Sequence, residues 1–188
     1  VRWDDVAFDG WPAVADLDDD GRPEIVRVGS GYVRANDAHG NILWDYLLED
    51  GGGGGPPTIA DFDGDGSAEI GVASREYYRV LEGDGSERWR NVVQDYSSAV
   101  TGSSVFDFEG DGAAEVVYAD EEVLWVYDGA TGAVELAYDA HSSWTLFEYP
   151  LVVDIDGDGA AEIALASNDC NYTGSRGITI LGERTDSW

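Results

Sequence analysis

An acidic loop recurs four times along this 188-residue chain, each time between two short apolar runs. The loops begin at Asp16, Asp61, Asp107 and Asp154, so successive copies are 45, 46 and 47 residues apart. A regular period of this length is typical of repeat architectures, in which each repeat buries its apolar face against a neighbour. We therefore expect residues 1–188 to form a single repeat region, with repeats at approximately 12–56, 57–102, 103–149 and 150–188.

Each period has the pattern of four short strands. In the second repeat, apolar runs at Thr58–Ala60 and Ile70–Ala73 flank the acidic loop, and a third run covers Tyr78–Leu81. A Gly-rich turn then leads to a fourth run around Trp89. Short β-rich runs between such turns indicate hairpins, and four strands in about 45 residues is the size of a propeller blade. The sequence predicts an all-β fold, a β-propeller of four-stranded antiparallel blades, with four blades in this chain.

The two ends of the chain are out of phase with these repeats. Residues 1–6 are similar to the fourth-strand segments of the first two repeats, whereas the last repeat stops soon after its third strand at Ile178–Leu181. Residues 1–6 could complete the last blade and close a four-bladed ring, which would remove exposed sheet edges. They could instead be the fourth strand of a preceding blade in a larger propeller. The absence of Met and the abrupt end at Trp188 favour the larger propeller, with further blades or domains in a longer parent chain.

Each acidic loop has the spacing of a metal-binding loop. Carboxylates stand at loop positions 1, 3, 5 and 9, a Gly at position 6 allows a sharp turn, and the main-chain carbonyl at position 7 could add another oxygen. An all-oxygen set in a flexible loop suits Ca²⁺ better than Mg²⁺, and without an ion such crowded carboxylates would raise one another's pKa. The predicted Ca²⁺ ligands are Asp16, Asp18, Asp20, Arg22 and Glu24; Asp61, Asp63, Asp65, Ser67 and Glu69; Asp107, Glu109, Asp111, Ala113 and Glu115; and Asp154, Asp156, Asp158, Ala160 and Glu162.

Two loops depart from the common pattern. Asp19 replaces Gly at position 4 of the first loop, and we expect it to adopt a positive φ, which Asp tolerates. Glu109 at position 3 of the third loop is longer than Asp and is expected to shift the geometry or affinity of that site. The alternatives are metal-free Asp/Gly turns, which four copies disfavour, and an EF-hand, whose bidentate Glu comes at position 12. The apolar residues at position 2 are expected to point into the core; they are Leu17, Phe62, Phe108 and Ile155.

On these motifs the chain resembles the FG-GAP (VCBS-like) repeat family, which includes the calcium-binding blades of integrin α-subunit propellers. The pattern Pro-x-x-x-Asp-x-Asp-x-Asp-Gly-x-x-Glu-Ile/Val occurs in all four repeats, with Pro missing only from the third, and the resemblance covers roughly residues 12–181. It implies a propeller with Ca²⁺ between the first two strands of each blade, up to four ions in all, and an extracellular or cell-surface setting. The family serves in adhesion, lectins, enzyme-attached modules and some polysaccharide lyases.

Charge restricts the possible partners. The chain has 39 acidic and 10 basic residues, a net charge of -29, and all of its basic residues are Arg. Such a surface excludes nucleic acid, because binding a phosphate backbone depends on cationic contacts. No apolar stretch approaches the ~20 residues that span a bilayer, so no membrane insertion is expected.

The loops opposite the acidic loops are the expected ligand-binding face. In a four-stranded blade, the loops between strands two and three and those between blades share one face, and functional loops on a rigid scaffold are common. Tyr96 and Trp144 are the candidate aromatic contacts for a glycan or protein ligand, whereas Trp11 and Tyr149 are expected to be core wedges between blades. The tryptophans within strands are expected in the core; they are Trp44, Trp89 and Trp125.

The expected function is a calcium-stabilised, non-catalytic extracellular module for binding or adhesion, or a scaffold. The alternatives are a part of a carbohydrate-active enzyme such as a polysaccharide lyase, catalytic or not, and a structural module of a surface assembly. Lyase chemistry on acidic sugars needs a base and cationic groups near the substrate carboxylate. With no Lys and no evident cluster of Arg, the sequence shows no catalytic constellation.

Overall fold

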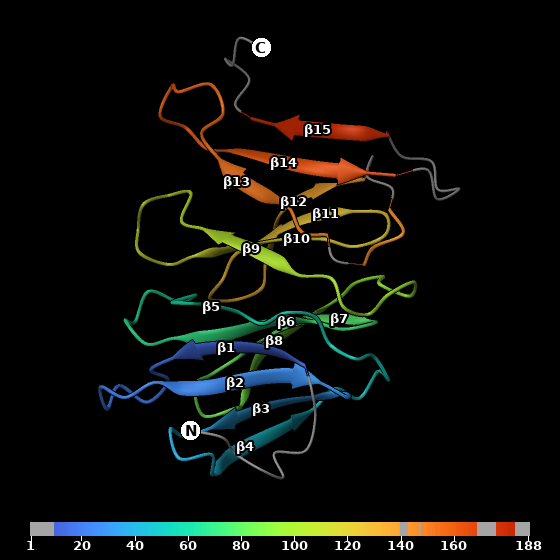
Figure 1. Ribbon diagram of the computed structural model, residues 1–188. Helices are drawn as coiled ribbons and strands as arrows, with labels where there is room; N and C mark the ends of the chain where they lie inside the picture. Colours follow the sequence, from blue (N-terminus) through green and yellow to red (C-terminus); the bar gives the residue numbers. More distant parts are fainter. Residues whose placement is uncertain (1–9, 140–142, 147, 169–175, 183–188) are drawn as a thin grey trace.

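The computed structural model describes residues 10–139, 143–146, 148–168 and 176–182, and all regular structure in these ranges is β-strand (Figure 1). The first sheet contains β1 (Trp11–Ala15), β2 (Glu24–Gly29), β3 (Tyr32–Asn36) and β4 (Ile42–Leu47). The second contains β5 (Thr58–Ala60), β6 (Glu69–Ala73), β7 (Tyr77–Leu81) and β8 (Glu87–Val92). The third contains β9 (Ser103–Phe106), β10 (Glu115–Ala119), β11 (Leu124–Tyr127) and β12 (Val134–Tyr138). The fourth contains β13 (Leu151–Val153), β14 (Glu162–Ser167) and β15 (Gly177–Leu181).

Every sheet is an antiparallel meander in which strands pair in chain order. The all-β prediction is confirmed, as is the antiparallel arrangement of short strands. Each acidic loop joins the first two strands of its sheet, so the four loops lie at corresponding strand ends, on the left in Figure 1. The segments that link one sheet to the next leave from the opposite ends of the strands.

The sheets follow one another in a row, with the first and fourth at opposite ends (Figure 1). Their first strands adjoin, β1 with β5, β5 with β9 and β9 with β13. Three apolar cores fill the three spaces between successive sheets, and they centre on Val26 with Ile70, on Tyr78 with Val116, and on Leu124 with Ile163. The described strands therefore form an open row and close no ring. Residues 1–6, predicted as a fourth strand, lie outside the described residues.

The position-2 residues of the loops separate into two pairs. Leu17 and Phe62 are buried between their own sheet and the next one, as predicted. The prediction is wrong for Phe108 and Ile155, which are 36% and 42% exposed. In each case the side chain needs a complete following sheet to cover it. Only three strands of the fourth sheet are described after Phe108, and no described sheet follows Ile155.

Of the three strand tryptophans, Trp89 is buried, whereas Trp44 and Trp125 are half-buried at the edges of the cores. Tyr149 is 55% exposed, so its prediction as a core wedge is wrong, and Trp11 is half-buried. No helix able to span a bilayer occurs among the described residues.

Candidate metal centres

The second acidic loop shows how the chain wraps around its first carboxylate. Asp61 Oδ1 accepts the main-chain N–H groups of Gly64 at 2.7 Å and Asp65 at 3.1 Å, and its Oδ2 accepts that of Gly66 at 2.9 Å. Asp63 Oδ1 accepts the N–H of Asp65 at 3.1 Å. These short-range bonds hold the loop as a series of Asx turns, the structure that Asp-Gly sequences favour.

Backbone conformation agrees with the loop pattern. The Gly residues at position 6 have φ between 82° and 98°, a region open to Gly at little cost. Asp19 at position 4 has φ 58°, close to the values of 74°, 72° and 82° at the Gly residues that occupy position 4 in the other loops. The predicted positive φ of Asp19 is confirmed.

The Glu at position 9 forms a hydrogen bond across each loop. Its Oε2 accepts the main-chain N–H of the position-2 residue in all four loops, which ties the start of the second strand to the end of the first. The bonds are Leu17 to Glu24 at 2.9 Å, Phe62 to Glu69 at 2.7 Å, Phe108 to Glu115 at 2.7 Å and Ile155 to Glu162 at 2.7 Å. All four Glu side chains are buried.

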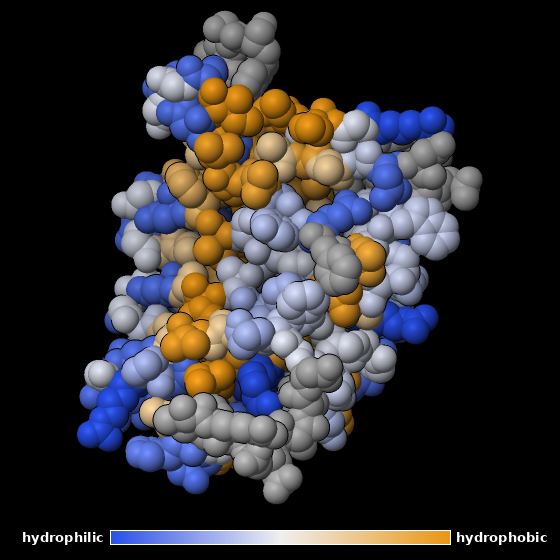
Figure 2. Space-filling view, viewed as in Figure 1, coloured by the Kyte–Doolittle hydropathy of each residue, from blue (hydrophilic) through white to orange (hydrophobic). Residues whose placement is uncertain are grey.

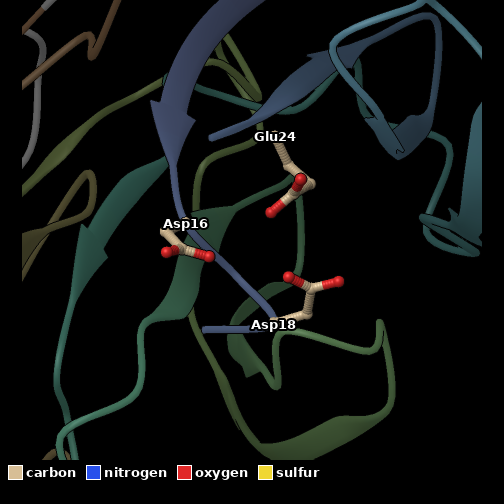
Figure 3. Close-up of side chains that lie close together, drawn as sticks. All are labelled: Asp16, Asp18 and Glu24. Carbon is tan, nitrogen blue, oxygen red and sulfur yellow. The ribbon is translucent and has the colours of Figure 1, made fainter. Parts of the chain in front are cut away.

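Three loops bring the carboxylates of positions 1, 3 and 9 together. In each, one oxygen from every carboxylate lies within 4.8 Å of the others; the groups are Asp16, Asp18 and Glu24; Asp61, Asp63 and Glu69; and Asp154, Asp156 and Glu162. Figure 3 shows the first group, in which the three side chains point into a common space. A cation in that space would meet oxygen atoms alone, which is the donor set of Ca²⁺.

The third loop shows no such group among the described residues. Burial, the Glu109 carboxyl hydrogen-bonded to Glu115, and the nearby Glu135 all raise the pKa of Glu115, to about 7. Glu109 thus turns toward Glu115, which agrees with the expectation that its extra methylene alters this site.

The position-5 carboxylates lie outside the three-member groups. Each accepts instead the N–H of position 7, from Arg22 at 2.8 Å, Ser67 at 2.8 Å, Ala113 at 2.9 Å and Ala160 at 2.8 Å. The position-5 carboxylates and the position-7 main-chain carbonyls are predicted ligands that would complete the coordination of an ion at the edge of the loop.

Electrostatics at these loops favour a cation. Burial, the Phe62 N–H and the carboxylates of Asp63, Glu82 and Asp61 act together on Glu69, and the net effect raises its pKa to about 7. Asp16 Oδ1 and Glu162 Oε1 are buried and have no protein hydrogen-bond partner. A buried carboxylate oxygen without a partner is costly, and a divalent cation in each of these two loops would satisfy the atom in that loop. The described residues therefore fit Ca²⁺.

One residue at these loops was not anticipated from the sequence. Arg88, in β8, places its Nη2 2.7 Å from Asp63 Oδ2 and donates from Nη1 to Glu82 at 2.8 Å. It stands 25 positions after Asp63 in the chain, outside the loop motif. Only the pairing register of β7 and β8 brings the two side chains together.

The two aromatic residues predicted to bind a ligand are both exposed. Tyr96 is 51% exposed, with the Arg75 guanidinium 5.4 Å from its ring centre, and Trp144 is 58% exposed. Tyr149 lines a small apolar pocket of about 230 Å³ with Trp11, Pro56, Val100 and Gly102. Trp11 is the first residue of β1, whereas Tyr96, Trp144, Tyr149 and the other pocket residues belong to the segments between sheets, opposite the acidic loops.

The fold is similar to several solved structures. The Vibrio cholerae biofilm matrix protein Bap1 aligns with a TM-score of 0.76 and 16% identity, over 94% of this chain and 56% of that one. The rhamnogalacturonan lyase YesW aligns with a TM-score of 0.61 and 15% identity, over 90% and 37%. A lectin of Agrocybe aegerita that recognises non-reducing terminal N-acetylglucosamine aligns with a TM-score of 0.53 and 18% identity, over 90% and 48%. At these identities the likeness shows the fold alone.

The chain spans about half of Bap1 and less of the other two. No curated protein sequence matches it significantly. The family model described as "FG-GAP-like repeat" matches residues 61–118, from the first Asp of the second loop into β10. Residues 61–118 are therefore an FG-GAP-like repeat, which confirms the resemblance inferred from the loop motif.

Proposed function

We propose that this chain is a calcium-stabilised, non-catalytic module that binds or scaffolds other molecules outside the cell. The observation that supports it is the recurrent carboxylate geometry: three of the four loops gather oxygens from positions 1, 3 and 9 within 4.8 Å. Isolated acidic clusters are common on protein surfaces. Here the same cluster recurs at the same place in the first, second and fourth sheets, and its position-9 Glu is buried each time.

The residues of each loop would couple the ion to the fold. Position 1 directly follows the first strand and position 9 begins or adjoins the second, so both strands contribute ligands to one centre. A bound Ca²⁺ would supply positive charge that offsets the repulsion among these carboxylates. The main-chain bonds of Asp61 and Glu69 already hold their carboxylates in place, so little further ordering is needed on binding.

We also propose that the four sheets are blades of a β-propeller with more than four blades. The fourth sheet leaves one face uncovered by described residues, and that face carries the exposed side chains of Leu151, Val153, Ile178 and Ile180. Figure 2 shows this apolar surface over β13–β15. In the first three sheets the corresponding face packs against the next sheet. An experimental structure in which these four blades close on one another would contradict the proposal.

A glycan or protein ligand is proposed for the face opposite the acidic loops, where Tyr96 and Trp144 are exposed. Glycan-array binding that Trp144→Ala abolishes would support this. Turnover of uronic-acid polymers would instead support the alternative, a polysaccharide lyase. Neither activity, together with self-assembly, would indicate a structural module of a surface assembly.

Thermal unfolding in Ca²⁺ and in EGTA tests the metal assignment. A site with a dissociation constant of ~10⁻⁴ M gains about 2.7 kcal/mol at ~10 mM Ca²⁺, so the melting temperature should rise by several degrees, since about 1 kcal/mol shifts it by about 2–4 °C at this size. Mg²⁺ at the same concentration is the control and should have a smaller effect. A melting temperature that Ca²⁺ leaves unchanged would rule out the assignment.

A further inference from the structure

The outer strand of each complete sheet carries a one-residue β-bulge at the same place. In the second sheet Val80 pairs with Trp89 and Leu81 with Glu87, so Arg88 is the extra residue. The same shift occurs between β3 and β4 and between β11 and β12. The three extra residues are Leu43, Arg88 and Glu135. A bulge re-aims the side chain of its extra residue, and here it does so beside the acidic loop.

Arg88 shows where the bulge residue points. Its Nη2 lies 2.7 Å from Asp63 Oδ2, and Asp63 is one of the three clustered carboxylates of the second loop. Its Nε donates to Ala130 O at 2.8 Å in the turn between β11 and β12, and its Nη1 donates to Glu82. The guanidinium is therefore held in place by two neighbouring sheets while it is bonded to a carboxylate oxygen of a predicted cation ligand.

The other two bulge residues give their loops a different charge. Burial, and then the nearby carboxylates of Glu109 and Asp128, raise the pKa of the Glu135 carboxyl group. It adds a negative charge beside the third loop. Leu43 in the first sheet is uncharged and 50% exposed. The three loops thus have a neutral, a positive and a negative side chain at one equivalent position.

We propose that the bulge residue of the outer strand sets the cation affinity of the acidic loop in its own sheet, and that Arg88 weakens Ca²⁺ binding at the second loop. This rests on the proposed calcium binding. Two physical effects act in the same direction. Arg88 competes for Asp63 Oδ2, and its positive charge repels a divalent cation a few ångströms away. A charge interaction near a protein surface is large enough to alter affinity about tenfold.

Isothermal titration calorimetry with Ca²⁺ alone, on the whole chain, tests this proposal. We expect Arg88→Leu to tighten one binding step about tenfold, and Asp61→Asn in the Arg88→Leu background to remove that step. Arg90→Leu is the matched control: it removes one positive charge from the same strand, but Arg90 pairs with Glu87 and stacks over Tyr77, away from the loop. Its binding isotherm should match that of the unmodified protein.

A converse variant keeps the test independent of the folding of Arg88→Leu. Leu43→Arg places the same side chain at the bulge of the first sheet, on an exposed position. It should weaken one binding step about tenfold. Ca²⁺ binding that is unchanged or weaker in Arg88→Leu, or unchanged in Leu43→Arg, overturns the bulge proposal and leaves calcium binding standing. Absence of Ca²⁺ binding in the unmodified protein overturns both.

Discussion

The Glu at position 9 has two roles in three of the four loops. Oε2 of Glu69 accepts the buried N–H of Phe62, and the same carboxylate belongs to the group with Asp61 and Asp63. The first role stabilises the chain without any ion, because an unpaired buried N–H is costly. The second role is unfavourable without an ion, as the raised pKa of Glu69 indicates. These roles can be separated by substitution.

Glu69→Gln and Glu69→Ala should differ in stability in EGTA. Gln keeps an oxygen for the Phe62 N–H and removes one of the clustered negative charges, so we expect the free energy of unfolding to be equal to or above that of the unmodified protein. Ala leaves the N–H unpaired and should lower it by about 1–3 kcal/mol. Urea denaturation measures both.

The two variants should respond alike to Ca²⁺, because neither offers the position-9 carboxylate. Each should gain less stability from Ca²⁺ than the unmodified protein does. A full calcium response in Glu69→Gln would show that Glu69 is not a ligand.

Successive sheets are joined through a Trp in the outer strand and a Gly turn in the next sheet. Trp44 donates its Nε1–H to Gly83 O at 2.9 Å, and Trp89 donates to Gly129 O at 2.6 Å. Each indole ring lies against a second Gly of the same turn, Gly85 or Gly132. A residue without a side chain is needed there, because the backbone of the turn and the ring are in direct contact.

Gly132→Ala should be more destabilising than the equivalent change at an open position. A Cβ on Gly132 would lie 2.6 Å from Trp89 Cδ2, so the ring or the turn must move. Gly51 is the matched control: its φ is 74° against 73° for Gly132, and a Cβ there would meet no atom within 4 Å.

Both variants carry the backbone cost of a positive φ, about 1–2 kcal/mol, and Gly132→Ala should lose about 1–3 kcal/mol more because of the overpacking. Urea denaturation in the presence of Ca²⁺ gives the difference. Equal losses at the two positions would show that the contact between ring and turn adds nothing to stability.

Across the whole molecule, the net charge of -29 opposes the compact state. The acidic loops lie at corresponding ends of successive sheets, so much of this charge is gathered on one face (Figure 1). Neighbouring loops lie in contact, as the hydrogen bond from Ser67 to Asp19 of the preceding loop shows, so the carboxylates of one loop are also close to those of the next. Monovalent salt and Ca²⁺ should therefore both stabilise the fold, by different means.

The melting temperature in EGTA should rise as NaCl is increased from ~0.1 to ~1 M, because the screening length falls from about 10 to about 3 Å. In Ca²⁺ the same salt series should have a smaller effect, since bound ions have already offset part of the charge. Differential scanning calorimetry measures both series. A salt response that is equal in EGTA and in Ca²⁺ would argue against ion binding at the loops.

The local features of this protein follow from its sequence. The period of 45 to 47 residues, the strand boundaries around Thr58–Ala60 and the positive φ of Asp19 depend on neighbouring residues, so patterns of apolar, acidic and Gly residues are sufficient to predict them. The close approach of the carboxylates at positions 1, 3 and 9 in three loops is also local, because the three residues lie within nine consecutive positions of one hairpin.

Other features depend on which strands and sheets come together in space. The contact of Arg88 with Asp63 requires the register of β7 and β8, and the exposure of Phe108 and Ile155 depends on what covers the sheet beyond them. Pairing register and sheet-to-sheet packing involve residues far apart in the chain, whereas a sequence pattern records only the preferences of near neighbours.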